Sequence, residues 1–204
     1  QDYDSQYKGN GIPFKFATFA TDGLEITVGN YYEQFGSGLV LRTYEDKGLG
    51  VDNALDGLRL KYSPFNGIYL TSLIGKSRTY FDYSDGIIRG ADAEIILNDI
   101  KGLENSKIYS IIGASFVSRF QSDNNPSFVL PENVAAFAAR ANLQFGNINY
   151  YGEYAHKIND PVGSMVQSEN NYANGKAIVN NISYSQKGLG ITFESHFVDH
   201  MEFR

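Results

Sequence analysis

The sequence predicts an all-β protein: an antiparallel up-and-down meander of about 10 to 11 strands, forming a transmembrane β-barrel or a large part of one. Three observations carry this prediction. Apolar and polar side chains alternate with a period of two, several alternating segments are long enough to cross a membrane, and short turns alternate with long loops. Residues 135–145 alternate most clearly, with Phe137, Leu143 and Phe145 on one face and Arg140 and Asn142 on the other.

Each strand is predicted from its own alternation and from the turn residues beside it. Asp22-Gly23 between two alternating runs is a strong hairpin signal, and Asn66-Gly67, Gly146-Asn147 and Lys187-Gly188 separate later pairs in the same way. The predicted strands are 12–20, 24–32, 38–44, 55–63, 68–78, 87–98, 107–120, 134–145, 148–158, 177–186 and 189–200.

The connections follow a rhythm that is typical of outer-membrane barrels, which have short turns at one rim and long loops at the other. The long polar stretches are predicted at 45–54, 79–86, 121–133 and 159–175, and they are interleaved with the short turns. Many predicted strands approach the roughly 9 to 11 residues that a tilted strand needs to cross a bilayer, whereas globular strands average about 5 to 6. This rhythm favours a barrel over a sandwich.

A soluble β-sandwich remains an alternative, because it shows the same alternation with the apolar face turned inward. The chain reads as one domain over residues 1–204, with residues 1–11 as an extended or poorly ordered entry. A net charge of -6 argues against nucleic acid as a partner, and the absence of cysteine excludes disulfides and thiolate metal sites. No apolar run reaches the length of a membrane helix.

Several stretches are more specific than the periodicity. They are Gly29–Leu39 with Arg42–Asp46, Leu49–Gly57, Arg89–Glu94, Pro131–Asn133 and Tyr184–Gly190. With these stretches the whole chain resembles an uncharacterised family of Gram-negative outer-membrane β-barrel proteins. The resemblance implies a barrel fold and a location in the cell outer membrane, and it implies no activity. It also implies a longer family chain, so we expect these residues to be a fragment of a larger barrel.

Charged side chains on the polar faces are the best functional candidates. In a barrel they line the lumen, where they either set the selectivity for ions and solutes or pair with one another to fill a narrow interior. Both interpretations stay open. The candidates are Arg42, Arg59, Lys61, Arg119, Arg140, Glu153, Lys157 and Glu194.

No catalytic, metal or cofactor site is expected. Glu153 and Glu194 could act as the carboxylate pair of a glycosidase, but the sequence does not fix their separation. Asp46, Asp52 and Asp56 could supply oxygen ligands to calcium, although their spacing does not match an EF-hand and a solvated acidic loop is favoured.

The leading hypothesis is a non-enzymatic outer-membrane barrel, acting as a porin-like channel or as a structural component. The expected partners are outer-membrane lipid, with small solutes or other outer-membrane proteins. Two rivals remain: a soluble or surface β-sandwich that binds a ligand such as a glycan, and a barrel enzyme acting on lipid or polysaccharide.

Overall fold

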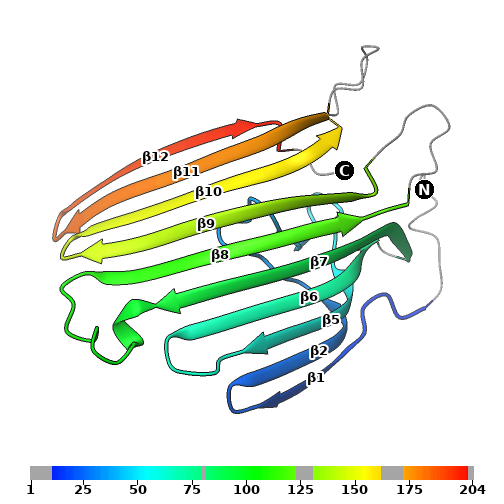
Figure 1. Cartoon of the computed structure of the whole chain (residues 1–204), viewed down its shortest axis with the longest axis horizontal. Helices are drawn as coiled ribbons and strands as arrows, with labels where there is room; N and C mark the ends of the chain where they lie inside the picture. The colour runs from blue at the N-terminus through cyan, green and yellow to red at the C-terminus, as the bar shows by residue number, and fades with distance from the viewer. Residues whose placement is uncertain (1–10, 80, 123–130, 162–171, 202–204) are drawn as a thin grey trace.

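A computed structural model describes residues 11–79, 81–122, 131–161 and 172–201, and its main element is one ten-stranded antiparallel sheet (Figure 1). The strands follow the chain in the order β1-β2-β5-β6-β7-β8-β9-β10-β11-β12, as predicted for a meander. Their bounds are β1 Phe16–Thr21, β2 Leu24–Tyr31, β5 Leu55–Tyr62, β6 Ile68–Thr79, β7 Asp82–Ile96, β8 Tyr109–Phe120, β9 Asn133–Phe145, β10 Ile148–Pro161, β11 Tyr172–Gln186 and β12 Leu189–Asp199.

The predicted strand at 38–44 is wrong. Only one isolated bridge, between Gln34 and Arg42, forms there, and Gly36 and Gly38 adopt positive φ angles that bend the chain instead of extending it. The predicted loop at 79–86 is mostly strand, because β6 and β7 continue to pair beyond a bulge near Lys76. The predicted entry segment, residues 1–11, lies outside the described residues except for Gly11.

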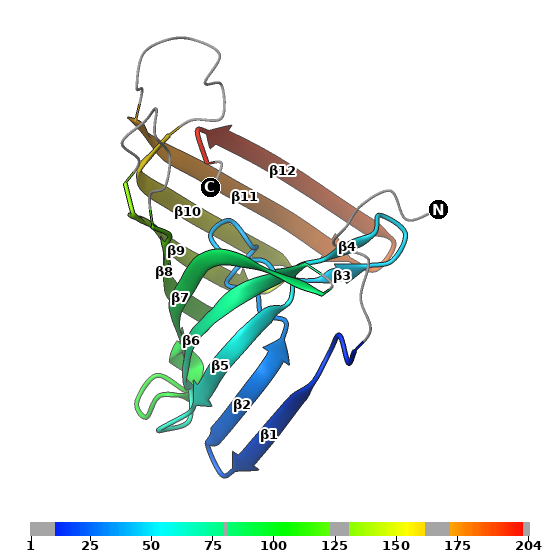
Figure 2. The same ribbon diagram turned by 90° about the vertical axis from the view of Figure 1, so that its right-hand side faces the viewer.

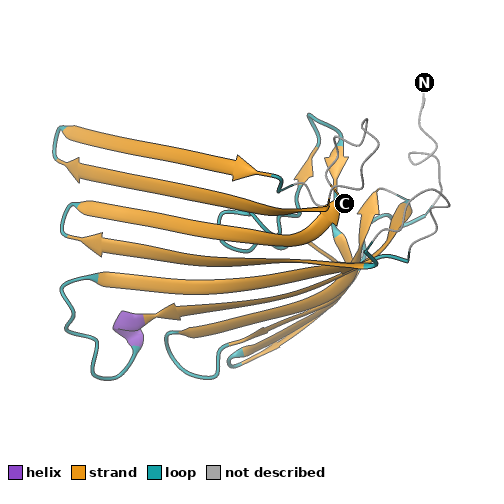
Figure 3. Ribbon diagram, turned by 45° about the horizontal axis from the view of Figure 1, so that its top comes forward, coloured by secondary structure: helices purple, strands orange, loops and turns teal. Residues whose placement is uncertain are grey.

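Four of the short turns gather at one end of the sheet, as the rhythm of the connections predicts (Figure 3). The turns β1–β2, β5–β6, β9–β10 and β11–β12 all lie there, together with a longer connection that contains the 3-10 helix η2, Leu97–Asp99. The connections β2–β5, β6–β7, β8–β9 and β10–β11 join their strands at the opposite end, which we call the long-loop end. The β6–β7 connection departs from the predicted rhythm, because β6 ends at Thr79 and β7 begins at Asp82.

The two faces of the sheet differ in chemistry. Directly opposed residues share a face, so the ladders place Phe116, Phe137 and Tyr154 on the same side as Ala114 and Ala139. This face is convex, and large apolar side chains on it are exposed. Examples from edge to edge are Phe19, Val28, Leu58, Leu70, Ile74, Ile112, Phe116, Phe137, Leu143, Phe145, Ile148, Ile178, Ile182, Ile191, Phe193 and Phe197.

The concave face is covered in part by the connection between β2 and β5, residues 32–54, which we call the inner segment (Figure 2). It carries a small hairpin of β3, Glu45–Asp46, and β4, Val51–Asp52. The buried core lies between this segment and the ten-stranded sheet, which we call the wall. In it Phe35, Val40 and Leu41 pack with Leu55, Leu73, Val117, Ala136, Ala138, Ala155 and Ala177. The core is therefore on the face that alternation marks as polar.

The main sheet has no second large sheet packed on its apolar face, so the described residues do not form the predicted alternative, a β-sandwich. In these residues β1 and β12 are the two outer strands and are not paired with each other. The assignment of faces is confirmed for β9: Phe137 is 44% exposed on the convex side, whereas the side chain of Arg140 is 7% exposed on the concave side. None of the described helices is both long and apolar enough to span a membrane.

Candidate functional site: the concave face and the inner segment

Phe35 is the apolar anchor of the inner segment. It is 1% exposed and belongs to the core that includes Leu73 of β6. Gly90 of β7 leaves the room for its ring, because a Cβ at that position would lie 2.9 Å from Phe35 Cε2. The missing side chain of this glycine thus lets the inner segment pack closely on the wall.

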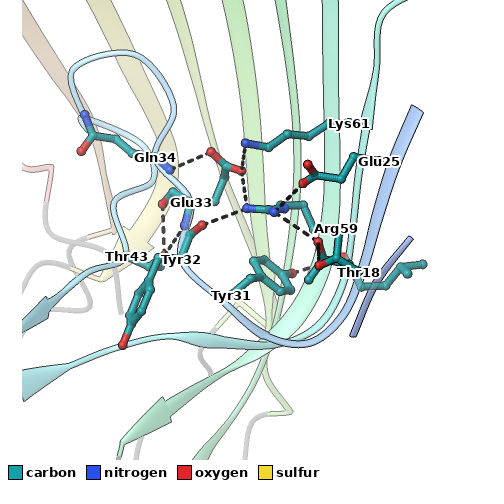
Figure 4. A network of polar contacts seen from close by, with 11 residues as sticks. Thr18, Glu25, Tyr31, Tyr32, Glu33, Gln34, Thr43, Arg59 and Lys61 are labelled. Atoms are coloured by element: carbon teal, nitrogen blue, oxygen red, sulfur yellow. Dashed lines mark hydrogen bonds and ion pairs between the residues drawn. The ribbon is translucent and has the colours of Figure 1, made fainter. Parts of the chain in front are cut away.

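Glu33 is the first of its charged anchors (Figure 4). Its Oε2 lies 3.3 Å from Arg59 Nη1 and 2.9 Å from Lys61 Nζ, and both cations belong to β5. Arg59 also binds Glu25 of β2 at 2.8 Å and donates to the Tyr32 carbonyl oxygen. Two predicted lumen residues, Arg59 and Lys61, therefore hold a carboxylate of the inner segment.

Glu153 of β10 is the second charged anchor. Its carboxylate is 2% exposed and accepts a hydrogen bond of 2.7 Å from the Ser37 backbone N–H and one of 2.5 Å from the Tyr151 hydroxyl. Gly36 adopts φ +54 beside it, and a Cβ there would lie 2.6 Å from Glu153 Oε1. Glycine is needed at this position because the backbone approaches the carboxylate so closely.

Asp52 fixes the other end of the inner segment to Arg78 of β6. The Arg78 guanidinium is buried, lies over the Phe14 ring and donates to the Pro13 carbonyl oxygen. Tyr32 donates its hydroxyl to Asp52 at 3.0 Å. Burial and then this hydrogen bond raise the pKa of Tyr32 to about 12, so the hydroxyl stays protonated well into the alkaline range.

Arg140 makes a separate cluster within the wall. Its guanidinium binds Asp92 at 2.8 and 2.9 Å, Glu94 at 3.1 Å and the Ser115 hydroxyl at 2.9 Å. These partners come from β7 and β8, so one cation joins three strands across the concave face. The two acids were not predicted as site residues, although Asp92 and Glu94 alternate with apolar residues as the predicted residues do.

The structure places the other predicted residues in differing surroundings. Arg42 is in the inner segment and not in a strand, Arg119 is half-buried on β8, and Lys157 is fully buried on β10. Glu194 of β12 is exposed and accepts a hydrogen bond from the Asn181 amide at 2.7 Å. The concave face thus brings Arg59, Lys61, Glu153 and Arg140 into defined contacts, whereas Glu194 stays apart from them.

The structure does not bring together the residues considered as a glycosidase carboxylate pair or as calcium ligands. Glu153 and Glu194 lie on strands separated by β11 and are offset by two positions along them, so their Cα atoms are about 12 Å apart, and Glu153 is engaged by the inner segment. Asp46 accepts from the Gly48 and Leu49 N–H groups, and Asp52 binds Arg78. In the described ranges no group of three His, Asp or Glu side chains could hold a metal ion.

The anchors Glu33 and Phe35 were missed because alternation describes strands, and these residues act from a connection. One signal was available. Residues 134–139 are apolar at every position, which indicates a strand covered on both faces and therefore a segment packed on the inner side.

Comparison with known proteins gives no match among curated proteins or solved structures. A family model covers the whole chain, residues 1–204, under the description of a family of unknown function. That description specifies neither a membrane nor an organism. Because that model matches the chain over its whole length, the chain belongs to the DUF6029 family.

Proposed function

We propose that the chain forms the wall of an outer-membrane β-barrel whose interior is occluded by the inner segment. The observation that supports this most strongly is the inverted polarity of the sheet. Large apolar side chains are exposed on the convex face, while buried ion pairs such as Arg140–Asp92 lie on the concave face. Exposed apolar patches of this extent mark contact with lipid or with protein.

Strand length supports the same proposal. The strands β6, β7 and β8 have 12, 15 and 12 residues. Such strands are about 40 to 50 Å long, and at a tilt of about 45° they cover about 28 to 35 Å, enough for the apolar band of a membrane barrel. Lipid does not satisfy open strand edges, so in a membrane β1 and β12 require partners.

Within this class we favour a closed barrel over a freely open porin. Such a barrel serves as a structural outer-membrane component, or as a channel that opens only when the inner segment moves. The lumen candidates Arg59, Lys61 and Glu153 bind Glu33 and Ser37 of the inner segment, and Arg59 and Glu153 are largely buried by it. Their contacts favour the interpretation of charges that fill the interior. We propose no catalysis.

Flotation with lipid vesicles tests the proposal. The full chain is diluted from urea into vesicles, and folded protein is expected to float with lipid, to keep its β-sheet circular dichroism and to resist extraction at alkaline pH. In a planar bilayer we expect low basal conductance. A monodisperse, folded β protein in buffer without detergent or lipid would overturn the membrane proposal, and steady large conductance would overturn the occlusion.

A further inference from the structure

A cavity of about 270 Å³ lies at the long-loop end, between the inner segment and the wall. Residues 38–43 form one side, and Ser77, Ile88 and Val117, from β6, β7 and β8, form the other. Met201 follows β12 and contributes to the lining, so the cavity gathers parts of the chain that are distant in sequence. A molecule bound here touches the inner segment and the wall together.

The lining combines an apolar side with cations. Leu39, Ile88 and Val117 supply aliphatic surface, and the guanidinium groups of Arg42 and Arg119 supply positive charge. Arg119 donates to Gln121 at 3.1 Å, and its guanidinium lies against Gly86, where a Cβ would be 2.4 Å from Arg119 Nε. The cavity thus has the composition expected of a site for an amphipathic anion.

Arg42 is the lining residue whose guanidinium N–H groups can bind a ligand. Within the described part of the chain no carboxylate lies within ion-pair distance of it, and its guanidinium carbon lies 4.9 Å from the centre of the Tyr44 ring. The polar neighbours are already used: Thr43 bonds to Glu33, and the Asn53 amide bonds to the Tyr44 N–H and the Arg42 carbonyl oxygen. These neighbours fix the backbone around Arg42 and leave its planar fork for a ligand.

We propose that this cavity binds a small organic carboxylate with an aliphatic tail, held by Arg42 through its carboxylate and by Ile88 and Val117 through its tail. The volume holds about nine water-sized groups, which suits a chain of roughly eight carbons. Since both sides of the cavity contribute, the ligand stabilises the inner segment in its docked position through mass action.

Calorimetry with octanoate tests the site on the full chain, folded and held in amphipol without vesicles, with folding verified by circular dichroism. We expect a dissociation constant of about 0.1 to 1 mM, as small ligands of this size typically reach. Arg42→Gln should weaken binding about tenfold, because a charge-assisted pair is lost. Arg89→Gln, on the convex face, is the matched control and should leave the affinity unchanged. Nonspecific uptake of octanoate by amphipol is the same for every variant and is measured by titrating amphipol without protein.

Octylamine is expected not to bind, and octanoate is expected to slow hydrogen exchange at the Phe35 and Thr43 amides, whose acceptors are the Leu41 and Glu33 carbonyl oxygens. Equal octanoate affinity in Arg42→Gln and in the unsubstituted chain would overturn the site. Binding without added protection would overturn the bridging of segment and wall. The membrane proposal does not enter these readouts, so its failure is seen separately in flotation.

Discussion

Strands β9 and β12 present similar convex faces and very different concave ones. In β9, Phe137 and Phe145 are exposed on the convex side, while Ala136 and Ala138 are buried on the other side against the core around the inner segment. In β12, Phe193 and Phe197 are exposed on the convex side, and Glu194 and Val198 are exposed on the concave side as well. Alternation alone decides which side chains point outward, whereas burial on the inside depends on contact with the inner segment.

The comparison also bears on closure. A central strand such as β9 pairs along its whole length with β8 and β10, but β12 pairs only with β11 in the described residues. In lipid such an edge leaves backbone groups without partners. We therefore propose that polypeptide other than the described residues completes the wall beside β1 and β12.

The largest effect is expected from cysteine cross-linking, since the result is all or none. Phe19→Cys combined with Ile26→Cys places two thiols at directly opposed positions of β1 and β2, within disulfide reach, and should oxidise readily in vesicles. Phe19→Cys combined in turn with Ile191→Cys, Phe193→Cys or Phe197→Cys should not cross-link within the chain. Efficient intramolecular cross-linking of any of these pairs would show that the described residues close on themselves.

The second prediction concerns the charged cluster on the concave face. Arg140→Leu leaves Asp92 and Glu94 without their shared cation, and we expect a loss of about 3 kcal/mol in the free energy of unfolding. Arg89→Leu, which removes an exposed charge from the middle of β7 on the convex face, should not lower the free energy of unfolding, because on a face in contact with lipid arginine is costly and leucine is favourable. Urea titration in vesicles measures both variants. A similar loss in the two would contradict the assignment of faces and of the cluster.

The third prediction separates the inner segment from the wall. Phe35→Ala removes the ring that packs beside Gly90 and should weaken the docking of the inner segment on the wall by about 3 kcal/mol. Hydrogen exchange at the Ser37 amide, which donates to Glu153, should then be about a hundredfold faster. Leu49→Ala, in the same segment but 73% exposed, serves as the control and should leave that exchange unchanged. Wild-type exchange rates in Phe35→Ala would mean that docking does not depend on this ring.

The fourth prediction tests lipid contact on β9 alone. Phe137→Glu puts a charge on the convex face and should make insertion less favourable by about 1 to 2 kcal/mol. A basic residue at the membrane midplane would cost more. Asn142→Glu changes the concave face of the same strand and should be tolerated. Folding yield in vesicles compares the two. Equal yields would contradict a lipid-facing convex side.

The strands were predictable because their signals are local. Asp22-Gly23 and Gly146-Asn147 mark turns between alternating runs, and the ladders join those runs in the predicted order. Residues 38–44 misled the prediction, because Leu39, Val40 and Leu41 form an apolar run like that of a strand. Their apolar surface is used against the concave wall, a contact between residues far apart in sequence that no local pattern specifies.

The candidate site was predictable in part for the same reason. Arg59, Lys61, Arg140 and Glu153 could be placed on the polar face from alternation alone. Their partners could not: Glu33 and Ser37 reach them from the inner segment, and Asp92 reaches Arg140 across β8. Whether a polar-face charge lines an open lumen or closes it depends on these partners.

The smallest effect is expected at Tyr32, in the inner segment. Tyr32→Phe removes the hydrogen bond to Asp52 and should lower the free energy of unfolding by about 1 kcal/mol at pH 8. The pKa of Tyr32 is raised from 10.0 to about 12 in the folded state, so its contribution is fully present below pH 10 and is lost as the pH rises toward 12. The difference between the variant and the unsubstituted chain should therefore shrink over that window. Tyr44→Phe, whose hydroxyl makes no hydrogen bond among the described residues, is the control and should leave the free energy of unfolding at pH 8 nearly unchanged. A gap that stays constant from pH 9 to pH 12 in urea titrations would contradict the role given to the Tyr32–Asp52 contact.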